Sequence, residues 1–471
     1  MFNAVSTEGT ETEPALRDYP SKLFVETTTH CNLRCPMCVK QSQDSQVTDG
    51  DLRPELFDAL EPAFPRLESL VLNGIGEPLM HPHLLDWVAR ARQAMPDDAW
   101  IGFQSNGLLL DKSIARKLVA AGLDRICLSV DGVKPETFSK VREGENLSDM
   151  ARAFAVLSEA RRTQPGSRLK VGAEFVTMRE NFRQLPDVVR WVAQRGADFC
   201  IVSQTLPYTP ASVQQATYHS SSEAAVAIFN EWKQRLAELG LDIHLYDQTP
   251  WKRKTQGGLE VASYRFHNTS KIPWRRQGSG GLEGDPRIDQ VNQLIDKMRL
   301  EARRRETFVD VRQILTRDMT LQDEVEEVYA EAQRVADEMG IELKLPAITP
   351  LADRRCDFVT GGSAFISWYG GVHPCYYLWH QYRCYVGDWD RLVKVKEFGN
   401  LNERPLLEIW NDTEFQVFRR NVLEFDYPYC SNCWGAPCNL VQEEDFQENC
   451  YSGNEPCGAC QWAMGLLQCL Q

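Results

Sequence analysis

The chain has 471 residues, enough for two or three domains with sizeable cores. Hydrophobic residues make up 43% and charged residues 25%, which is typical of a globular protein. The net charge of -14 argues against a nucleic-acid backbone or an anionic membrane as the main partner, and no apolar run approaches a membrane span in length.

The first twenty residues are polar and acidic, without the basic and apolar regions of a secretory signal. We therefore expect a cytoplasmic protein, with a flexible tail at residues 1–20. Because disulfides are rare in that compartment, the fifteen cysteines indicate metal or cluster ligation.

From residue 21 to about residue 250, short apolar runs alternate with helical patterns. The expected strands are Lys22–Glu26, Ser69–Leu72, Trp100–Gln104, Arg125–Val130, Lys170–Thr177 and Phe199–Ser203. The expected helices between them include Pro82–Ala94, Lys112–Ala121, Leu147–Thr163 and Leu185–Gln194. This alternation predicts an α/β fold with a parallel sheet and right-handed crossovers.

Directly after the first expected strand, Cys31, Cys35 and Cys38 form a C-x3-C-x2-C pattern. Three thiolates are one short of the four that normally hold a [4Fe-4S] cluster, which would leave one iron open to another ligand. Structural zinc sites usually take four ligands in two close pairs, so zinc fits this spacing less well. The spacing therefore favours an iron–sulfur cluster, with zinc as the alternative.

The following expected strands also end in polar or glycine-rich stretches. The second precedes Asn73-Gly74-Ile75-Gly76-Glu77-Pro78, the third ends in Gln104-Ser105-Asn106-Gly107, and the fourth in Ser129-Val130-Asp131-Gly132. Glycines let a ligand approach the backbone closely, and a carboxylate can accept from an ammonium group. Each stretch is also an ordinary turn, so a structural role stays open.

Beyond residue 213 the pattern becomes irregular. A helix over residues 213–239 precedes an expected strand at 241–245, and a similar helix precedes a second expected strand at 341–345. The similarity of these two helix–strand pairs indicates either an internal duplication or, more simply, two independent occurrences of a helix, a glycine and a strand in that order. Residues 251–283 are polar and read as a long loop, whereas 284–339 have helical spacing.

The C-terminal part is rich in cysteine and aromatic residues. Cys356, Cys375, Cys430 and Cys433 give one four-thiolate set, which suits zinc and a cluster about equally on spacing alone. Tyr376, Tyr377, Trp379, His380 and Tyr382 indicate either a cover over a metal site or a substrate wall. Cys127 and Cys200 lie inside apolar strands and are expected to be buried thiols.

The cysteine triad and the Gly-x-Gly-Glu-Pro stretch together resemble radical S-adenosylmethionine (SAM) enzymes. The run from Cys356 to Cys433, with Gly-Val-His-Pro-Cys and Gly-Asn-Leu, resembles their SPASM/Twitch extension. The resemblance implies a partial (β/α)6 barrel with a C-terminal auxiliary-cluster domain. We divide the chain into a tail (1–20), the barrel (21–250), an insertion of loop plus helix (251–320), a helix–strand connector (321–350) and the SPASM/Twitch domain (351–471).

The resemblance also implies cofactors and their ligands. Cys31, Cys35 and Cys38 would hold a [4Fe-4S] cluster whose fourth iron is chelated by SAM, and Cys356, Cys375, Cys430 and Cys433 would hold an auxiliary [4Fe-4S] cluster. A second auxiliary cluster on Cys438, Cys450, Cys457 and Cys460 is a further hypothesis, with Cys384 or Cys469 able to replace any of them. The expected SAM contacts are Met37, Gly74, Gly76, Glu77, Pro78, Ser105, Asn106, Ser129 and Asp131, with Arg142 and Glu174 as weaker candidates.

The implied function is an oxidoreductase or maturase. It cleaves SAM to a 5′-deoxyadenosyl radical, takes a hydrogen atom from a peptide or protein side chain, and oxidises or cross-links it with the auxiliary cluster. The alternatives are a Twitch-type dehydrogenase of a sugar or cyclitol alcohol and a non-catalytic scaffold that binds zinc. The implied electron donor is a flavodoxin or ferredoxin; no catalytic base is nominated.

Overall fold

The structure is a computed structural model of the chain. It describes residues 13–42, 45–246, 251–254, 260–261, 275–276, 286–305, 307, 309–315, 319–351, 353–386, 389–428 and 455–471. Within these ranges, no helix is long and apolar enough to cross a membrane.

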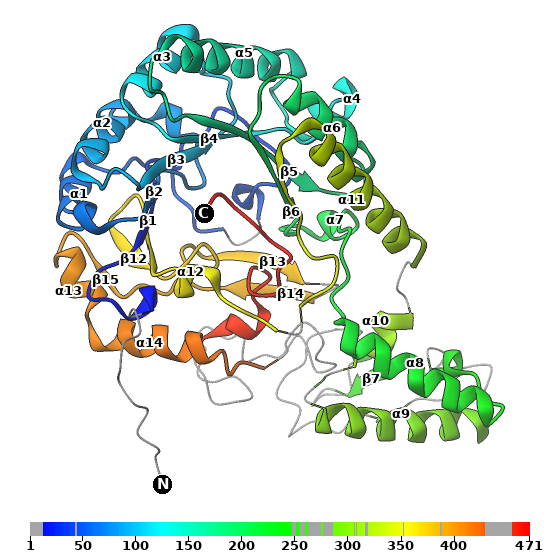
Figure 1. Cartoon of the computed structure of the whole chain (residues 1–471). Helices are drawn as coiled ribbons and strands as arrows, with labels where there is room; N and C mark the ends of the chain where they lie inside the picture. Colours follow the sequence, from blue (N-terminus) through cyan, green and yellow to red (C-terminus); the bar gives the residue numbers. More distant parts are fainter. Residues whose placement is uncertain are drawn as a thin grey trace.

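Six parallel strands in chain order form the central part of one curved sheet (Figure 1). They are β1 (Lys22–Val25), β2 (Ser69–Val71), β3 (Trp100–Ser105), β4 (Arg125–Ser129), β5 (Lys170–Thr177) and β6 (Phe199–Gln204). Each strand pairs in parallel with the next along the chain. The predicted partial (β/α)6 barrel is confirmed, with strand ends within one residue of those expected.

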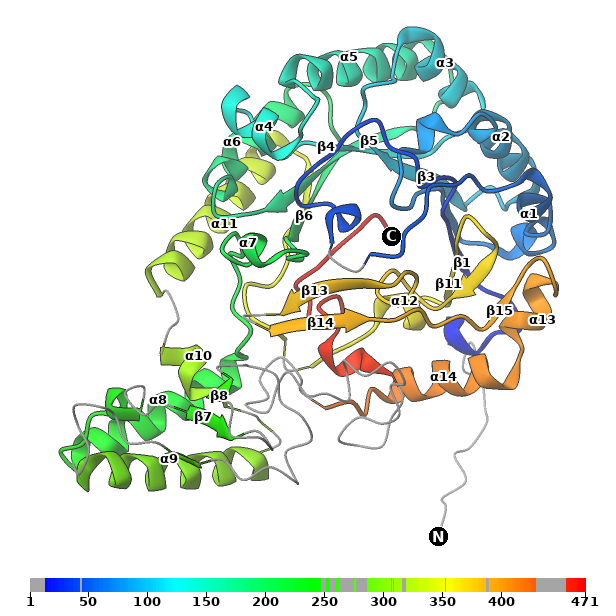
Figure 2. The ribbon, with the colours of Figure 1, turned by 180° about the vertical axis from the view of Figure 1, so that it is seen from behind.

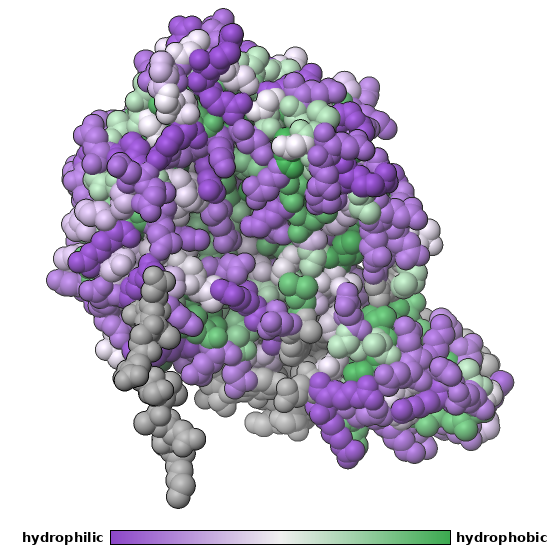
Figure 3. All heavy atoms as spheres, in the orientation of Figure 1, coloured by the Kyte–Doolittle hydropathy of each residue, from purple (hydrophilic) through white to green (hydrophobic). Residues whose placement is uncertain are grey.

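Helices cover the outer, convex side of this sheet, as both ribbon views show (Figures 1 and 2). They are α1 (Pro54–Asp58), α2 (Leu84–Ala94), α3 (Lys112–Ala120), α4 (Pro135–Val141), α5 (Leu147–Thr163), α6 (Leu185–Ala193) and α11 (Met319–Met339). Helical spacing of apolar residues sets the inward face; in α2 the buried residues are Leu84, Trp87, Val88 and Ala91. The solvent face over these helices is mostly hydrophilic (Figure 3).

The sheet continues past both ends of the six-strand barrel. At one end β10 (Glu342–Lys344) pairs in parallel with β6. At the other, β11 (Ser363–Ile366) pairs in parallel with β1 and is followed by β12 (Gly371–His373) and β15 (Gly399–Asn400). The ten strands therefore form one sheet, in which β1 is an inner strand held between β2 and β11.

The rest of the C-terminal part packs beside these added strands. It comprises α12 (Asp357–Thr360), the hairpin β13 (Tyr382–Val386) and β14 (Trp389–Val393), α13 (Leu406–Trp410) and α14 (Thr413–Glu424). The short helix α7 (Pro210–Val213) follows β6 of the barrel. Residues 455–471 then run back into the space enclosed by the sheet, where the chain end lies in both views (Figures 1 and 2). There the backbone N–H of Gln204 donates to the carbonyl of Leu466 at 3.1 Å.

A smaller helical lobe has a hydrophobic cluster of its own. It contains α8 (Glu223–Glu238), α9 (Pro286–Arg304), α10 (Val311–Leu315) and short strands β7 (Trp251–Lys254), β8 (Glu260–Val261) and β9 (Arg275–Arg276). The predicted helical pattern of α9 is confirmed, because Val291, Ile295 and Met298 are buried. The stretch 251–283, predicted as a long loop, contains the three short strands β7, β8 and β9, which pair antiparallel.

The predicted strand at 241–245 is wrong, since Ile243–Tyr246 forms a 3-10 helix. Ile243 and Tyr246 pack into the hydrophobic cluster of the helical lobe, and among the described residues no strand pairs with this segment. The matching segment near residue 342 does pair, with β6, so the expected strand there is confirmed. The other 3-10 helices in the described ranges are Pro14–Leu16, Val39–Gln41, Glu61–Arg66, Pro78–Met80, Phe182–Gln184 and Pro456–Ala459.

Candidate functional site

The loop that follows β1 carries Cys31, Cys35 and Cys38 at the carboxyl edge of the sheet. Backbone contacts attach this loop to the stretch after β2. The N–H of Gly76 donates to the carbonyl of Thr28 at 3.1 Å, and that of Glu77 donates to the carbonyl of His30 at 2.8 Å. The shape of the cysteine loop is thus set partly by the neighbouring strand end.

The three thiols lie close enough together for their charges to interact. Burial raises the pKa of Cys35 to about 11, and it also raises the pKa values of Cys31 and Cys38. The backbone N–H group of Leu33 lowers the pKa of Cys31, and that of Lys40 lowers the pKa of Cys38, so both oppose the effect of burial. Partly buried thiols that attract N–H donors suit ligation of a cationic cluster, which would hold them ionised.

Gly74 and Gly76 allow two segments to touch. A Cβ at Gly76 would lie 2.3 Å from the carbonyl oxygen of Thr28, and one at Gly74 would lie 2.5 Å from Cγ of Glu26. The glycines are therefore required by the packing of the cysteine loop. A direct contact of these glycines with SAM stays a prediction.

Glu77 is buried and links the loops after β2 and β3. Its carboxylate accepts from Asn106 N at 2.7 Å, from Ser105 Oγ at 2.8 Å and from Leu79 N at 3.1 Å. Burial raises the pKa of Glu77, although these donors oppose the shift. Since protein groups already engage both of its oxygens, the predicted contact with an ammonium would add to this set.

Asn106 brings the end of β3 to the cysteine loop. Its Nδ2 donates to Asn32 Oδ1 at 2.7 Å and lies 3.9 Å from Cys31 Sγ. The other expected SAM contacts also lie at strand ends or in this loop: Met37 is half-buried, Pro78 begins a 3-10 helix, and Ser129 is the last residue of β4.

A buried group of charges comprises Asp131 after β4, Arg142 after α4 and Glu174 within β5. Asp131 accepts from Arg142 Nε at 2.7 Å and from the backbone N–H of Val176 at 2.7 Å. The positive charge of the Arg142 guanidinium also lowers the pKa of all three thiols of the triad. Glu174 accepts from Gln104, and burial together with Asp131 raises the pKa of Glu174 to about 7. Asp131, Arg142 and Glu174, all named from the sequence, are thus brought together.

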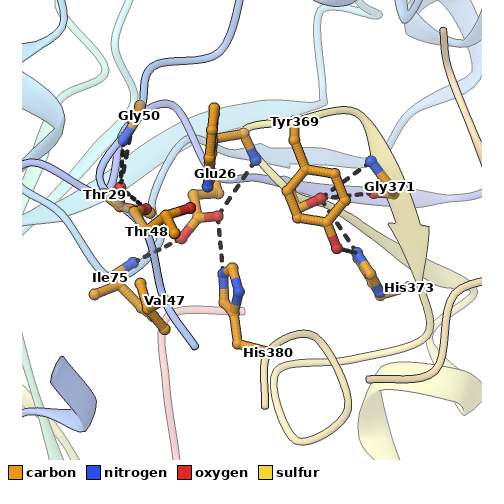
Figure 4. A network of polar contacts seen from close by, with 12 residues as sticks. Glu26, Thr29, Val47, Thr48, Gly50, Ile75, Tyr369, Gly371, His373 and His380 are labelled. Atoms are coloured by element: carbon orange, nitrogen blue, oxygen red, sulfur yellow. Dashed lines mark hydrogen bonds and ion pairs between the residues drawn. The ribbon is translucent and has the colours of Figure 1, made fainter. Parts of the chain in front are cut away.

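The sequence reasoning missed Glu26 as a site residue and named its partner, His380, only as part of the aromatic stretch. Glu26 follows β1 directly, is fully buried, and accepts from Ile75 N at 3.2 Å and Trp368 N at 3.3 Å. His380 Nε2 lies 3.0 Å from Glu26 Oε2. Figure 4 shows the two side chains facing each other. In the sequence, Glu26 could have been noticed as a carboxylate at the end of an apolar strand, directly before the cysteine loop. Its partner, more than 300 residues away, could not be read from spacing.

The auxiliary cysteines are only partly described. Cys430, Cys433, Cys438 and Cys450 lie outside the described residues. Cys356, Cys375, Cys457 and Cys460 are described, and all are free thiols. No group of three His, Cys, Asp or Glu side chains in the described ranges converges as ligands of a single metal ion.

The aromatic residues after Cys375 form a packed layer. Tyr376 packs edge-on against Phe24 at 5.2 Å, and Trp379 packs edge-on against Phe365 at 4.4 Å between ring centroids. All five predicted residues of this stretch, Tyr376, Tyr377, Trp379, His380 and Tyr382, are buried. The interpretation as a cover agrees with this burial.

Two family models match the chain. Residues 25–192 match the radical SAM superfamily, and residues 356–434 match SPASM, an iron–sulfur cluster-binding domain. This chain is a radical SAM enzyme with a SPASM domain. The radical SAM domain uses a [4Fe-4S] cluster and SAM, and the SPASM domain binds further iron–sulfur clusters. The alternative of a non-catalytic zinc scaffold therefore does not hold.

The enzyme is similar to named proteins. A tungsten-containing aldehyde ferredoxin oxidoreductase cofactor-modifying protein of Pyrococcus furiosus is 27% identical over 453 residues, 95% of this chain and 96% of that protein. A probable GTP 3′,8-cyclase of Methanocaldococcus jannaschii is 25% identical over 42% of this chain and 62% of that protein. Among solved structures, Streptococcus suis SuiB bound to the precursor peptide SuiA covers 89% of this chain and 71% of its own, with TM-score 0.44 and 13% identity.

Proposed function

We propose that this radical SAM enzyme is a maturase that oxidises or cross-links a side chain of a peptide or protein. Its substrate would belong to the maturation of an oxidoreductase that carries a cofactor. The observation that supports this is similarity over 95% of the chain to a protein named as modifying the cofactor of an oxidoreductase. When bound, the clusters and SAM supply a 5′-deoxyadenosyl radical and an acceptor for the electron left on the substrate.

In this proposal the chain contributes ligation and position. Cys31, Cys35 and Cys38 hold the first cluster. The loop after β2 and the polar residues after β3 and β4 bind SAM. Arg142, which is paired with Asp131, provides a positive charge beside the thiols and would attract a carboxylate. The aromatic layer after Cys375 and residues 455–471, which lie in the space enclosed by the sheet, exclude water from the radical.

A second candidate substrate is the cofactor itself, because the name of the Pyrococcus relative refers to a modified cofactor. The small-molecule alternative, a sugar or cyclitol alcohol, also stays open. The three classes can be separated by asking which one the radical attacks.

The experiment measures 5′-deoxyadenosine formed by the anaerobically reconstituted enzyme with SAM and a chemical reductant. Substrate-free enzyme is compared with three additions: peptides and apoprotein of a tungsten-containing oxidoreductase, the cofactor fraction extracted from that oxidoreductase, and a set of sugar and cyclitol alcohols. We expect the peptide or apoprotein to accelerate the reaction, and deuterium placed in its side chains to appear in 5′-deoxyadenosine. Acceleration by the alcohols alone would support the dehydrogenase alternative.

The control is the Cys31/Cys35/Cys38→Ala variant beside Cys127→Ala, in which a thiol buried in β4 is removed. The triple variant should form no 5′-deoxyadenosine, whereas Cys127→Ala should retain the reaction. Equal reaction in wild type and triple variant would contradict the assignment of the triad.

A further inference from the structure

The segment 455–471 lies directly against the beginning of the SPASM domain. The backbone N–H of Leu351 donates to the carbonyl of Met464 at 3.0 Å, and that of Arg355 donates to the carbonyl of Ala463 at 3.2 Å. Residues 351 and 355 therefore both lie against the adjacent residues Ala463 and Met464. These two bonds bring Cys460, three residues before Ala463, toward Cys356, the neighbour of Arg355.

Aromatic contacts extend this arrangement to a third cysteine. The ring of Trp462 lies 6.4 Å from that of Phe358 and 6.3 Å from that of Tyr377. Phe358 is two residues after Cys356, and Tyr377 is two residues after Cys375. Trp462, two residues after Cys460, therefore packs between the segments that follow the other two cysteines.

The three cysteines have similar backbone surroundings. The N–H groups two and three residues further along lower the pKa of each thiol, against the effect of burial: Phe358 and Val359 for Cys356, Tyr377 and Leu378 for Cys375, and Trp462 and Ala463 for Cys460. In the triad, the N–H group two residues further along likewise lowers the pKa of Cys31 and of Cys38. No backbone donor of this kind acts on Cys127, Cys200 or Cys384. Hydrogen bonds to sulfur are one means by which proteins tune iron–sulfur clusters.

Cys457 completes a group of four. It is three residues before Cys460, whose N–H donates to its carbonyl at 3.0 Å, and its thiol interacts with those of Cys460, Cys356 and Cys375. All four are free, and Cys375, Cys457 and Cys460 are less than 10% exposed. Four cysteine thiolates are the usual ligand set of a [4Fe-4S] cluster.

We propose that Cys356, Cys375, Cys457 and Cys460 are the four ligands of one auxiliary iron–sulfur cluster. This set replaces the grouping of Cys356 and Cys375 with Cys430 and Cys433 expected from the sequence. Both pairs have C-x2-C spacing, so spacing could not choose between them. Cys457 and Cys460 lie beyond residue 434, where the matched SPASM region ends. The inference rests on the auxiliary clusters of the proposed function and assigns ligands for one of them.

The test counts iron and sulfide after anaerobic reconstitution of the full chain. Three variants are compared with the wild type: Cys356→Ala/Cys375→Ala, Cys457→Ala/Cys460→Ala, and the quadruple variant that combines them. Because the two pairs hold one cluster, each double variant should lose about four irons and the quadruple variant also about four. A loss of about eight in the quadruple variant, or none in Cys457→Ala/Cys460→Ala, would overturn the proposal.

Cys469→Ala is the matched control, since Cys469 is an equally buried thiol of the same segment outside this group. It should keep the iron content of the wild type. The double variants should retain the irons of the triad. Failure of this ligand set is read from the iron counts, so it is distinguishable from failure of the proposed function, which is read from 5′-deoxyadenosine formed by the wild type.

If a double variant loses the irons of the triad as well, its folding is impaired. The single variant Cys460→Ser then tests whether Cys460 is a ligand of the auxiliary cluster. Its hydroxyl oxygen replaces one sulfur ligand. The electron paramagnetic resonance signal of the reduced auxiliary cluster should then change while the triad signal is kept. An unchanged auxiliary signal contradicts the proposal.

Discussion

Glu26 is the side chain at which the cysteine loop and the SPASM domain meet. It stands between the end of β1 and the triad, and its oxygens hold the backbone of Ile75 from the glycine-rich stretch and of Trp368 from the segment after β11. His380 approaches the same carboxylate from the aromatic layer (Figure 4). One buried carboxylate thus fixes the relative positions of three segments that are distant in sequence.

Replacing Glu26 with Gln should destabilise the protein by about 1–3 kcal/mol, because an amide nitrogen cannot accept and would leave a buried donor unsatisfied. The measurement is urea unfolding of the anaerobically reconstituted protein. Glu403→Gln, at an exposed position, is the control and should change the unfolding free energy little. An equal effect of the two substitutions would contradict this role of Glu26.

Glu145 should make stability depend on pH. It is 2% exposed, and neither of its carboxylate oxygens has a hydrogen-bond partner in the described part of the chain, although Oε2 lies 3.9 Å from Arg142 Nη1. Burial raises the pKa of Glu145 to about 8, above the ordinary value of 4.5. The folded state therefore binds the proton more tightly than the unfolded state, and stability falls as pH rises from about 4.5 to 8.

The Glu145→Gln variant removes this titration. Between pH 6 and 8 the wild type should lose on the order of 1–2 kcal/mol more unfolding free energy than the variant. Unfolding at both pH values checks this, with Glu143→Gln, an exposed neighbour, as the control. Parallel pH profiles for wild type and Glu145→Gln would refute the role of Glu145.

At the scale of elements, the loop after β2 supports the loop after β1. Gly76→Ala would place a methyl group 2.3 Å from the carbonyl oxygen of Thr28, which is backbone and cannot turn aside. The cysteine loop must shift, so we expect the variant to retain less of the triad cluster, with a loss approaching about four irons per chain.

Iron and sulfide counts after reconstitution measure this loss. Gly240→Asn is the control, since nothing lies within 4 Å of a Cβ there and asparagine tolerates its positive φ of 71°. Full iron content in Gly76→Ala would show that the cysteine loop adapts to the added methyl group.

The elements also show what sequence reasoning can reach. Strand positions such as Lys170–Thr177 were predictable because apolar runs bounded by turns reflect local burial. The segment near residue 243 was mispredicted because its conformation depends on packing against α9, which no local pattern contains. The pairing of Glu26 with His380 depends on three-dimensional contact in the same way, as does the grouping of Cys356 with Cys460.

For the whole molecule, the two cysteine regions share one sheet. β1 carries the triad loop at its end and pairs with β11 through residues 22–25. The ring of Phe24 is covered by Phe358 at 5.6 Å and by Tyr376 at 5.2 Å. The SPASM domain therefore supplies the strand that pairs with the free edge of β1 and the aromatic side chains that bury Phe24.

A fragment ending at residue 351 should fail to remain monomeric. Removal of β11 turns β1 into an edge strand and uncovers Phe24, and such edges pair with other chains. Size-exclusion chromatography with light scattering should report aggregates, and co-expression of residues 352–471 should restore soluble material. A monodisperse fragment that binds about four irons would contradict this dependence.

The pairing of β1 with β11 also fixes an order of events during synthesis. Lys22 pairs with Ser363, so a ribosome that adds roughly 5–20 residues per second needs tens of seconds between making the two partners. The triad is synthesised early in that interval, and its strand lacks one neighbour until Ser363 has been added. Completion of the sheet, and not emergence of the cysteines, therefore sets the earliest moment at which the cysteine loop can receive iron in its final shape.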